Sequence, residues 1–295
     1  MPALLIDALI DTLKDCLRLL PFLFLTYLFM EYLEHKTQKK TVSMLRHAGP
    51  LGPLIGSVLG AFPQCGFSAA AAGFYATGVI SCGTLIAVFL STSDEMLPIF
   101  LSALAEHSLS LSAILKIIGI KILLAFLFGC LIDAVLHLLL KKRDPAAHEN
   151  IHAVCEKEHC HCENGILRSA LHHTANILFF LFVIIFLLNA AVALIGEDRI
   201  SSFVADTGVL SVFLTPLIGL IPNCAASVVI TQLFLEGMID FSAMMGGLLT
   251  GSGVGLLVLF RQSGSLKRNL CITCVMYLIG ASVGIIMHAL AFSPV

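Results

Sequence analysis

The chain reads Pro63-Gln64-Cys65-Gly66-Phe67-Ser68 in its first third and Pro222-Asn223-Cys224-Ala225-Ala226-Ser227 in its last quarter. The two copies lie 159 residues apart, and this offset aligns residues 63–101 with residues 222–260 without a gap. Identical residues at equivalent positions are Pro63/Pro222, Cys65/Cys224, Ser68/Ser227, Gly78/Gly237, Ile80/Ile239, Leu90/Leu249, Ser93/Ser252 and Leu97/Leu256. Apolar sequences match one another by chance, so the shared Pro-[Gln/Asn]-Cys-x-x-Ser motif and its fixed register carry the argument. They predict an internal duplication.

The composition indicates a polytopic membrane protein. Hydrophobic residues make up 58% of the chain and charged residues only 12%, whereas a soluble domain carries about 25% charged residues. Because a chain that crosses lipid must satisfy its backbone polar groups internally, we expect an all-α fold. The nucleotide-binding motif GxxxxGK[ST] is absent from the sequence, which argues against a nucleotide cofactor.

Six segments are long and apolar enough to cross a bilayer, which takes about 20 residues of helix. The expected spans are 17–34, 83–104, 112–140, 170–195, 240–261 and 269–292. Before the first of them, residues 3–18 place charged side chains at helical spacing against a Leu/Ile face. This pattern is typical of an amphipathic helix that lies at the membrane interface.

Two further apolar segments, 50–79 and 209–237, are interrupted at Pro63 and Pro222. Each is either one broken crossing or a re-entrant hairpin, and the positive charges favour hairpins. Lys and Arg concentrate in 34–49, 141–170 and 261–268, which the positive-inside rule places in the cytoplasm. Two full crossings would instead put Lys141, Lys142 and Arg143 outside.

With hairpins, the two halves acquire opposite orientations, five elements each. We therefore predict an inverted five-plus-five repeat: a first membrane repeat at 1–140, a cytoplasmic His/Cys-rich loop at 141–169, and a second membrane repeat at 170–295. The hairpin tips would meet near the midplane. Inverted repeats with interrupted helices at a central site are typical of alternating-access transporters.

Asp94 and Glu95 lie inside the expected span 83–104. An ionised carboxylate at that depth costs at least about 2.5–3.5 kcal/mol on insertion scales, so the pair requires a cation, a proton or water. The alternative to a functional site is a salt bridge to Lys116 or Lys121. Pro98 interrupts regular helix here, and the equivalent segment, 250–255, is rich in Gly and has no acids.

Cys65 and Cys224 form the second part of the candidate site. Thiolates favour zinc, copper(I) or trivalent arsenic, and carboxylates favour manganese or magnesium. The alternative is that both Cys simply fill space, since free Cys is often buried. The candidate substrate path comprises Asp94, Glu95, Gln64, Cys65, Ser68, Asn223, Cys224, Ser227, Ser91, Ser93 and Ser252.

The central loop carries metal-ligating side chains in a spacing that fits no single zinc-finger pattern. These residues are His148, His152, Cys155, His159, Cys160, His161 and Cys162, followed by His172 and His173. Such tracts bind borderline and soft divalent metals. We interpret the loop as a cytoplasmic metal collector, and the alternative is a linker whose ligands are incidental.

Three other polar features are weaker candidates. Asp133 and His137, one turn apart, fit either a proton or metal relay or an interfacial pair. Asn189, inside the span 170–195, is expected to bridge helices. Cys271 and Cys274 are expected to serve packing.

The chain resembles a family of bacterial and archaeal ten-span heavy-metal exporters. Some members are labelled arsenic efflux proteins and others manganese transporters, and the family is distantly similar to organoarsenical permeases. The resemblance rests on GAFPQCGFSAAAAGFYATGVISCGTLIAVFLSTSDEMLP at 60–98, on PNCAAS, on LLTGSGVGLL and on the His/Cys-rich loop. It implies export of a metal ion or metalloid.

Together these observations predict a non-enzymatic, secondary-active exporter in a prokaryotic inner membrane, coupled to protons through Asp94 or Glu95. Its partners would be the transported ion (manganese, zinc or arsenite) and the lipid bilayer, with no nucleic acid and no bound cofactor. A homo-oligomer is one option that the sequence leaves open. Two alternatives remain: a thiol-disulfide electron conductor that uses Cys65 and Cys224, and a metal-sensing membrane scaffold.

Overall fold

A computed structural model describes residues 2–36, 51–93, 95–105, 107, 109–139, 166–195 and 210–293. Asp94 and the loop ligands from His148 to Cys162 lie outside the described residues. Every element in the described part of the chain is a helix. This confirms the all-α expectation for these residues.

The helices of the first half are α1 (Pro2–Lys36), α3 (Leu51–Gly60), α4 (Cys65–Ala76), α5 (Cys82–Ser91), α6 (Met96–Ala105) and α7 (Leu111–Leu139). Those of the second half are α9 (Ile166–Ile195), α11 (Ser211–Gly219), α12 (Cys224–Leu235), α13 (Phe241–Thr250), α14 (Gly255–Gln262) and α15 (Leu266–Ala289). Helices α12 and α13 begin and end 159 residues after α4 and α5. Gly78 and Gly237, which follow α4 and α12, share a φ of 72°. The element boundaries therefore follow the offset found in the sequence.

Five segments are long and apolar enough to cross a membrane: Cys82–Ala105, Leu111–Leu138, Ala170–Ala190, Phe241–Gln262 and Leu266–Ala289. They coincide to within a few residues with five of the six expected spans. The sixth, 17–34, lies in α1, a single helix that also contains residues 3–18. Thus no separate interfacial helix precedes it.

Two expected spans are not continuous helices. Span 83–104 consists of α5 and α6, and span 240–261 consists of α13 and α14. Pro98 lies in the first turn of α6, where a proline is tolerated, and it disfavours a continuous helix from α5 into α6. The second interruption, at 251–254, contains Gly253 at a φ of 53°, a conformation that glycine adopts without strain.

Each half is built around one buried helix. Helices α3 and α7 pack on α5, and α11 and α15 pack on α13 in the same way. Residues Gly83–Ser91 of α5 and all residues of α13 are buried. Many large apolar side chains of α7, such as Leu115, Leu123 and Leu127, are instead exposed, as expected for a helix that contacts lipid.

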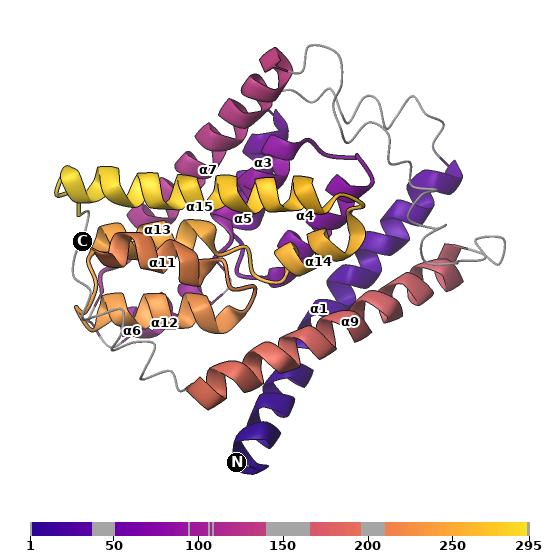
Figure 1. The fold of residues 1–295 in the computed structure, drawn as a ribbon, viewed down its shortest axis with the longest axis horizontal. Helices are drawn as coiled ribbons and strands as arrows, with labels where there is room; N and C mark the ends of the chain where they lie inside the picture. The colour runs from indigo at the N-terminus through magenta and orange to yellow at the C-terminus, as the bar shows by residue number, and fades with distance from the viewer. Residues whose placement is uncertain are drawn as a thin grey trace.

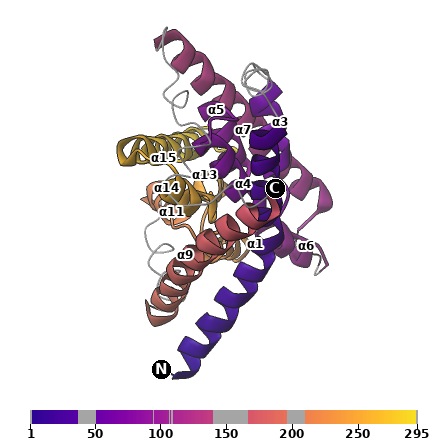
Figure 2. The same ribbon diagram turned by 90° about the vertical axis from the view of Figure 1, so that its right-hand side faces the viewer.

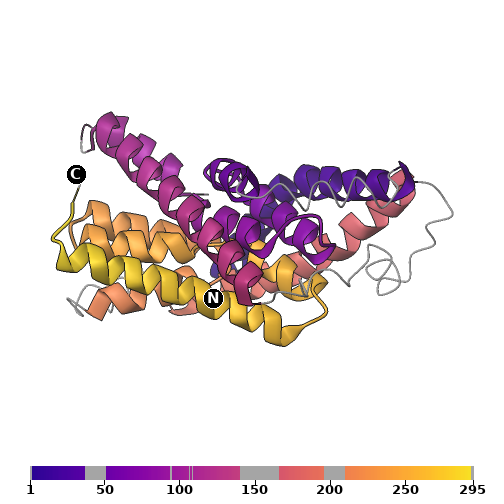
Figure 3. The ribbon, with the colours of Figure 1, turned by 90° about the horizontal axis from the view of Figure 1, so that it is seen from above.

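The two halves contact one another through the helices that follow the interruptions at Pro63, 92–95, Pro222 and 251–254. Helix α4 packs on α14, α12 packs on α6, and α1 packs along α9. Figure 1 shows α11, α12, α13 and α15 side by side, with α1 and α9 at the edge of the molecule. Figure 2 shows the N-terminal part of α1 extending beyond its neighbours, and Figure 3 shows most of the first half and most of the second on opposite sides.

Candidate functional site

The centre of the site is a pair of thiols. The Sγ atoms of Cys65 and Cys224 lie 3.6 Å apart, although 159 residues separate them in sequence. Each Cys is the first residue of its helix, α4 or α12, after an extended residue, Gln64 or Asn223. The two Pro-containing segments therefore end facing one another, and the two cysteines are not joined in a disulfide.

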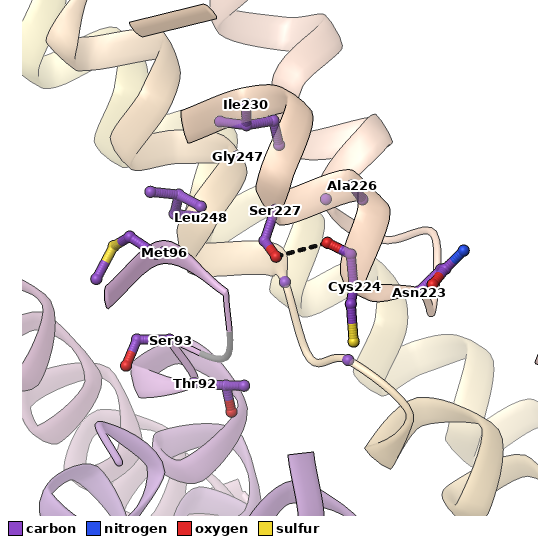
Figure 4. A pocket seen from close by; sticks show the side chains of 13 residues that line it. Thr92, Ser93, Met96, Asn223, Cys224, Ala226, Ser227, Ile230, Gly247 and Leu248 are labelled. Atoms are coloured by element: carbon purple, nitrogen blue, oxygen red, sulfur yellow. Dashed lines mark hydrogen bonds between the residues drawn. The ribbon is translucent and has the colours of Figure 1, made fainter. Parts of the chain in front are cut away.

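A small cavity, partly open to the exterior, lies beside Cys224 and is shown in Figure 4. Thr92, Ser93 and Met96 reach it from the first half, and Cys224 and Ser227 reach it from the second. Gly219, Gly247, Gly251 and Gly253 contribute backbone to its wall.

Several helices begin or end at this cavity. Helices α12 and α6 begin at Cys224 and Met96, while α5, α11 and α13 end beside Thr92, Gly219 and Gly251. The first N–H groups and the last C=O groups of a helix lack partners within the helix. The cavity wall can thus offer backbone donors and acceptors to a ligand, in addition to side chains.

Three of the candidate serines donate their hydroxyl protons to backbone carbonyls of the same helix or its first residue. Ser68 donates to the carbonyl of Cys65, and Ser227 donates to the carbonyl of Cys224, each at 2.8 Å. Ser91 donates to the carbonyl of Val88 and is buried. Of these three, Ser227 lines the cavity.

Ser93 and Ser252 occupy equivalent positions in the two interruptions but differ in their contacts. Ser93 lines the cavity and donates to the carbonyl of Ala61 at 2.6 Å. Ser252 is buried, and its Oγ has no hydrogen-bond partner among the described residues. An unsatisfied buried hydroxyl costs free energy, so Ser252 is a candidate to contact a ligand or water.

The two amides at the helix starts also differ. Asn223 donates to Asn189 Oδ1 at 2.7 Å, and Asn189 donates to Thr12 Oγ1 at 3.0 Å. This chain connects α12 to α9 and α1, so the prediction that Asn189 bridges helices is confirmed. Gln64 is half-buried and makes no capping hydrogen bond with its side chain.

Glu95 lies directly before α6, next to the cavity-lining Met96. Its Oε1 is 3.7 Å from Arg18 Nη1 of α1. The salt bridge that the structure shows for Glu95 is therefore with Arg18, a partner that the sequence analysis did not consider. Lys121 is buried and its Nζ donates to the carbonyl of Thr92, at the interruption itself.

Asp133 caps a helix. It accepts hydrogen bonds from Ser81 Oγ at 2.6 Å and from the Gly83 backbone N–H at 2.8 Å, at the start of α5. These contacts give Asp133 a capping role, and the relay or interfacial pair considered for Asp133 and His137 stays a prediction. Cys271 and Cys274 are exposed on α15, which argues against a packing role in the isolated chain.

Among the residues that the structure describes, no three or more His, Cys, Asp or Glu side chains are grouped to hold a metal ion. A structural zinc site has four protein ligands. The thiol pair is compatible with incomplete ligation, because two thiolates on one tetrahedral ion with Zn–S bonds of 2.3 Å lie about 3.8 Å apart. The sulfur atoms of Cys65 and Cys224 are already close to that separation.

The fold and the site define an integral membrane protein with an internally repeated helical architecture. Residues 4–143 and 99–260 match the family described as "Putative, 10TM heavy-metal exporter", and the chain belongs to this family. No curated protein and no solved structure matched the chain.

Proposed function

We propose that the protein is a secondary-active transporter that exports a heavy-metal ion or metalloid by alternating access. The observation that carries the proposal is the meeting of Cys65 and Cys224 at the starts of two equivalent helices. Family membership supports the class of cargo. The thiol pair, together with the backbone groups of the cavity beside Cys224, supports a soft or borderline ion, such as zinc, cadmium or arsenite.

In this proposal the two thiolates are the principal ligands of the cargo. Metal ligation requires deprotonated sulfur, so cargo binding releases protons. Glu95 and Asp94 would accept the released protons or balance the charge of the ion, which couples cargo movement to protons.

Weak ligation suits a carrier. Two protein thiols leave further coordination positions to water or to backbone groups at the cavity wall, so the ion can leave as well as bind. A complete four-ligand site holds zinc as a permanent part of a fold. The free Oγ of Ser252 and the lone pairs of Ser227 would complete the coordination in one of the two transport states.

The proposed membrane arrangement is an inverted repeat. The segment that ends at Cys65 would enter from the cytoplasm and the segment that ends at Cys224 from outside, so the two hairpins would open to opposite aqueous spaces while their tips meet near the midplane. Lys and Arg in the connections 34–49, 141–170 and 261–268 support this orientation. The His/Cys-rich loop would then collect cytoplasmic metal for export.

Transport into proteoliposomes tests the proposal, with manganese, zinc, cadmium and arsenite as a competition panel. Cys65→Ser and Cys224→Ser should each lower flux of zinc, cadmium or arsenite by about 10–100-fold, because each removes a sulfur ligand. Cys271→Ser is the matched control, since this Cys is exposed on α15, and it should transport like wild type. Wild-type flux and selectivity in both site variants would contradict the proposal.

The 3.6 Å separation also favours a second candidate, a thiol-disulfide electron conductor. A disulfide between Cys65 and Cys224 would form with the release of two protons and two electrons to an oxidant. Such a protein would carry electrons from a dithiol enclosed in liposomes to an external disulfide, with no metal present. Electron transfer without metal flux would establish this candidate and exclude the exporter.

A further inference from the structure

We propose that Arg18 is a tethered counter-cation for the transport site: it neutralises Glu95 when no cargo is bound, and cargo displaces it. This inference rests on the proposed function and adds a residue to its mechanism. The observation is the contact between Arg18 Nη1 and Glu95 Oε1, which joins α1 to the interruption before α6.

The ion pair between Arg18 and Glu95 is weak enough to be broken by a competing cation. Its 3.7 Å separation exceeds the range of a direct N–H···O hydrogen bond, so the pair is held by charge alone. The Arg18 side chain is 67% exposed and that of Glu95 is 29% exposed. Separating them breaks no buried hydrogen bond, and a divalent ion competes well against a single, partly solvated guanidinium.

Arg18 lies on the exposed side of α1, between the buried residues Cys16 and Leu19. It stands at the start of the expected span 17–34. The guanidinium can therefore stay in contact with water while it pairs with Glu95, as a counter-cation that is exchanged during transport requires.

The carboxylate of Asp15 is a second candidate partner for the Arg18 guanidinium. Asp15 is half-buried, lies three residues before Arg18 on α1, and is close enough to both Arg18 and Glu95 to interact with their charges. Side chains three residues apart are neighbours on a helix surface, so Asp15 is within reach of Arg18 as an alternative counter-charge. Asp15 and Glu95 are thus alternative partners for one cation.

This exchange of partners explains how an empty carrier could return. With Arg18 on Glu95, the Glu95 carboxylate of the empty site is paired, which lowers the cost of the conformational change across the bilayer. With cargo bound, the ion replaces Arg18. Loss of the Arg18 charge should therefore tighten cargo binding but block the return of the empty carrier.

Three measurements on Arg18→Gln test this, with cadmium as the probe: direct binding in detergent, net flux, and cadmium–cadmium exchange, which needs no empty return. The dissociation constant should fall by about twofold to fivefold, as expected for loss of a partly exposed competing ion pair. Net flux should fall at least about tenfold while exchange stays within about twofold of wild type. Arg18→Lys should restore net flux.

Lys14→Gln is the matched control. Lys14 is a cation on the same helix, it pairs with Asp11 at 3.0 Å, and both side chains are exposed. This variant should behave like wild type in all three measurements. A merely structural role for Arg18 would lower net flux and exchange together and leave the dissociation constant unchanged, which overturns the inference.

A second variant, Asp15→Asn, should change the dissociation constant for cadmium in the opposite direction. Asp15→Asn removes the alternative partner, so Arg18 stays on Glu95 and cadmium binding should weaken. An unchanged dissociation constant in Asp15→Asn overturns the inference even if Arg18→Gln does not fold. Absence of cadmium binding and flux in the wild type would overturn the proposed function itself, whereas normal wild-type flux with unaltered Arg18 and Asp15 variants overturns the inference alone.

Discussion

At the scale of single residues, equivalent positions in the two halves make different contacts. Cys65 and Cys224 are alike in place and chemistry, yet Cys224 lines the cavity, and its neighbour Asn223 is held by Asn189. Ser93 has a hydrogen-bond partner, whereas Ser252 has none among the described residues. The duplication thus supplies a common scaffold on which the two sides of the site differ.

Asp133 provides a prediction at this scale. Its carboxylate caps the start of α5, the buried helix of the first half, through Ser81 and Gly83. Asp133→Ala should lower stability by about 1–2 kcal/mol, because the capping acceptor is lost. Thermal unfolding in detergent measures this as a lower Tm. His137→Ala, an exposed position one turn further along α7, is the control and should leave Tm unchanged.

If Asp133 were instead a proton or metal relay, Asp133→Ala would abolish transport at unchanged Tm. Retained flux per folded molecule together with a lower Tm identifies the capping role. The two readouts separate the structural interpretation from the functional one.

At the scale of elements, small residues allow the helices of each half to approach closely. A Cβ at Gly60 of α3 would lie 2.1 Å from Ser91 Oγ and 2.4 Å from the carbonyl of Val88. A Cβ at Gly219 of α11 would lie 2.1 Å from the carbonyl of Gly247. Such contacts are typical of membrane helices, which associate by close packing of small side chains. Ser91 of α5 is buried at this contact with α3, and its place in the substrate path stays a prediction.

Gly60→Ala and Gly219→Ala should each be destabilising by about 1–3 kcal/mol, because backbone atoms must move to admit the methyl group. The measurement is the amount of folded protein that survives heating in detergent. Gly119→Ala on α7 is the control: its Cβ would meet nothing within 4 Å. A loss at Gly119 equal to that at Gly60 would contradict the packing argument.

At the scale of the whole molecule, each half contributes helices that pack against the other half. Helix α4 of the first half packs on α14, and α12 of the second half packs on α6. The two interrupted segments therefore cannot move independently of the opposite half. Alternating access in this arrangement requires the tips that carry Cys65 and Cys224 to shift relative to one another.

Oxidation of the thiol pair tests that requirement. A mild oxidant should join Cys65 to Cys224, since the sulfur atoms need to approach from 3.6 Å to the disulfide bond length of about 2.0 Å. The cross-link should stop metal flux, and a reductant should restore it. In Cys65→Ser this cross-link cannot form, so the flux that remains in the variant should be insensitive to the oxidant. Undiminished flux with the cross-link formed would show that the tips do not separate during transport.

Much of the architecture follows from sequence alone. Hydrophobic segments of sufficient length predict membrane helices, and five of the six expected spans are present as candidate membrane segments. Local chemistry also predicted breaks at Pro63 and Pro222, and both lie between helices. Pro98 predicted the interruption of span 83–104, and this break is present between α5 and α6. The segment 250–255 was recognised only as rich in Gly, and no break was predicted in span 240–261, because overall apolarity does not report the backbone freedom of Gly251 and Gly253.

The sequence by itself determined that this is a helical membrane protein with a duplicated Pro-[Gln/Asn]-Cys-x-x-Ser motif, because composition and local repeats are properties of neighbouring residues. Tertiary structure alone decided which side chains meet. The pairing of Cys65 with Cys224, of Arg18 with Glu95, and of Asn223 with Asn189 joins residues far apart in the chain. Such contacts depend on how helices pack, and packing is set by the shape of whole faces, which no local pattern encodes.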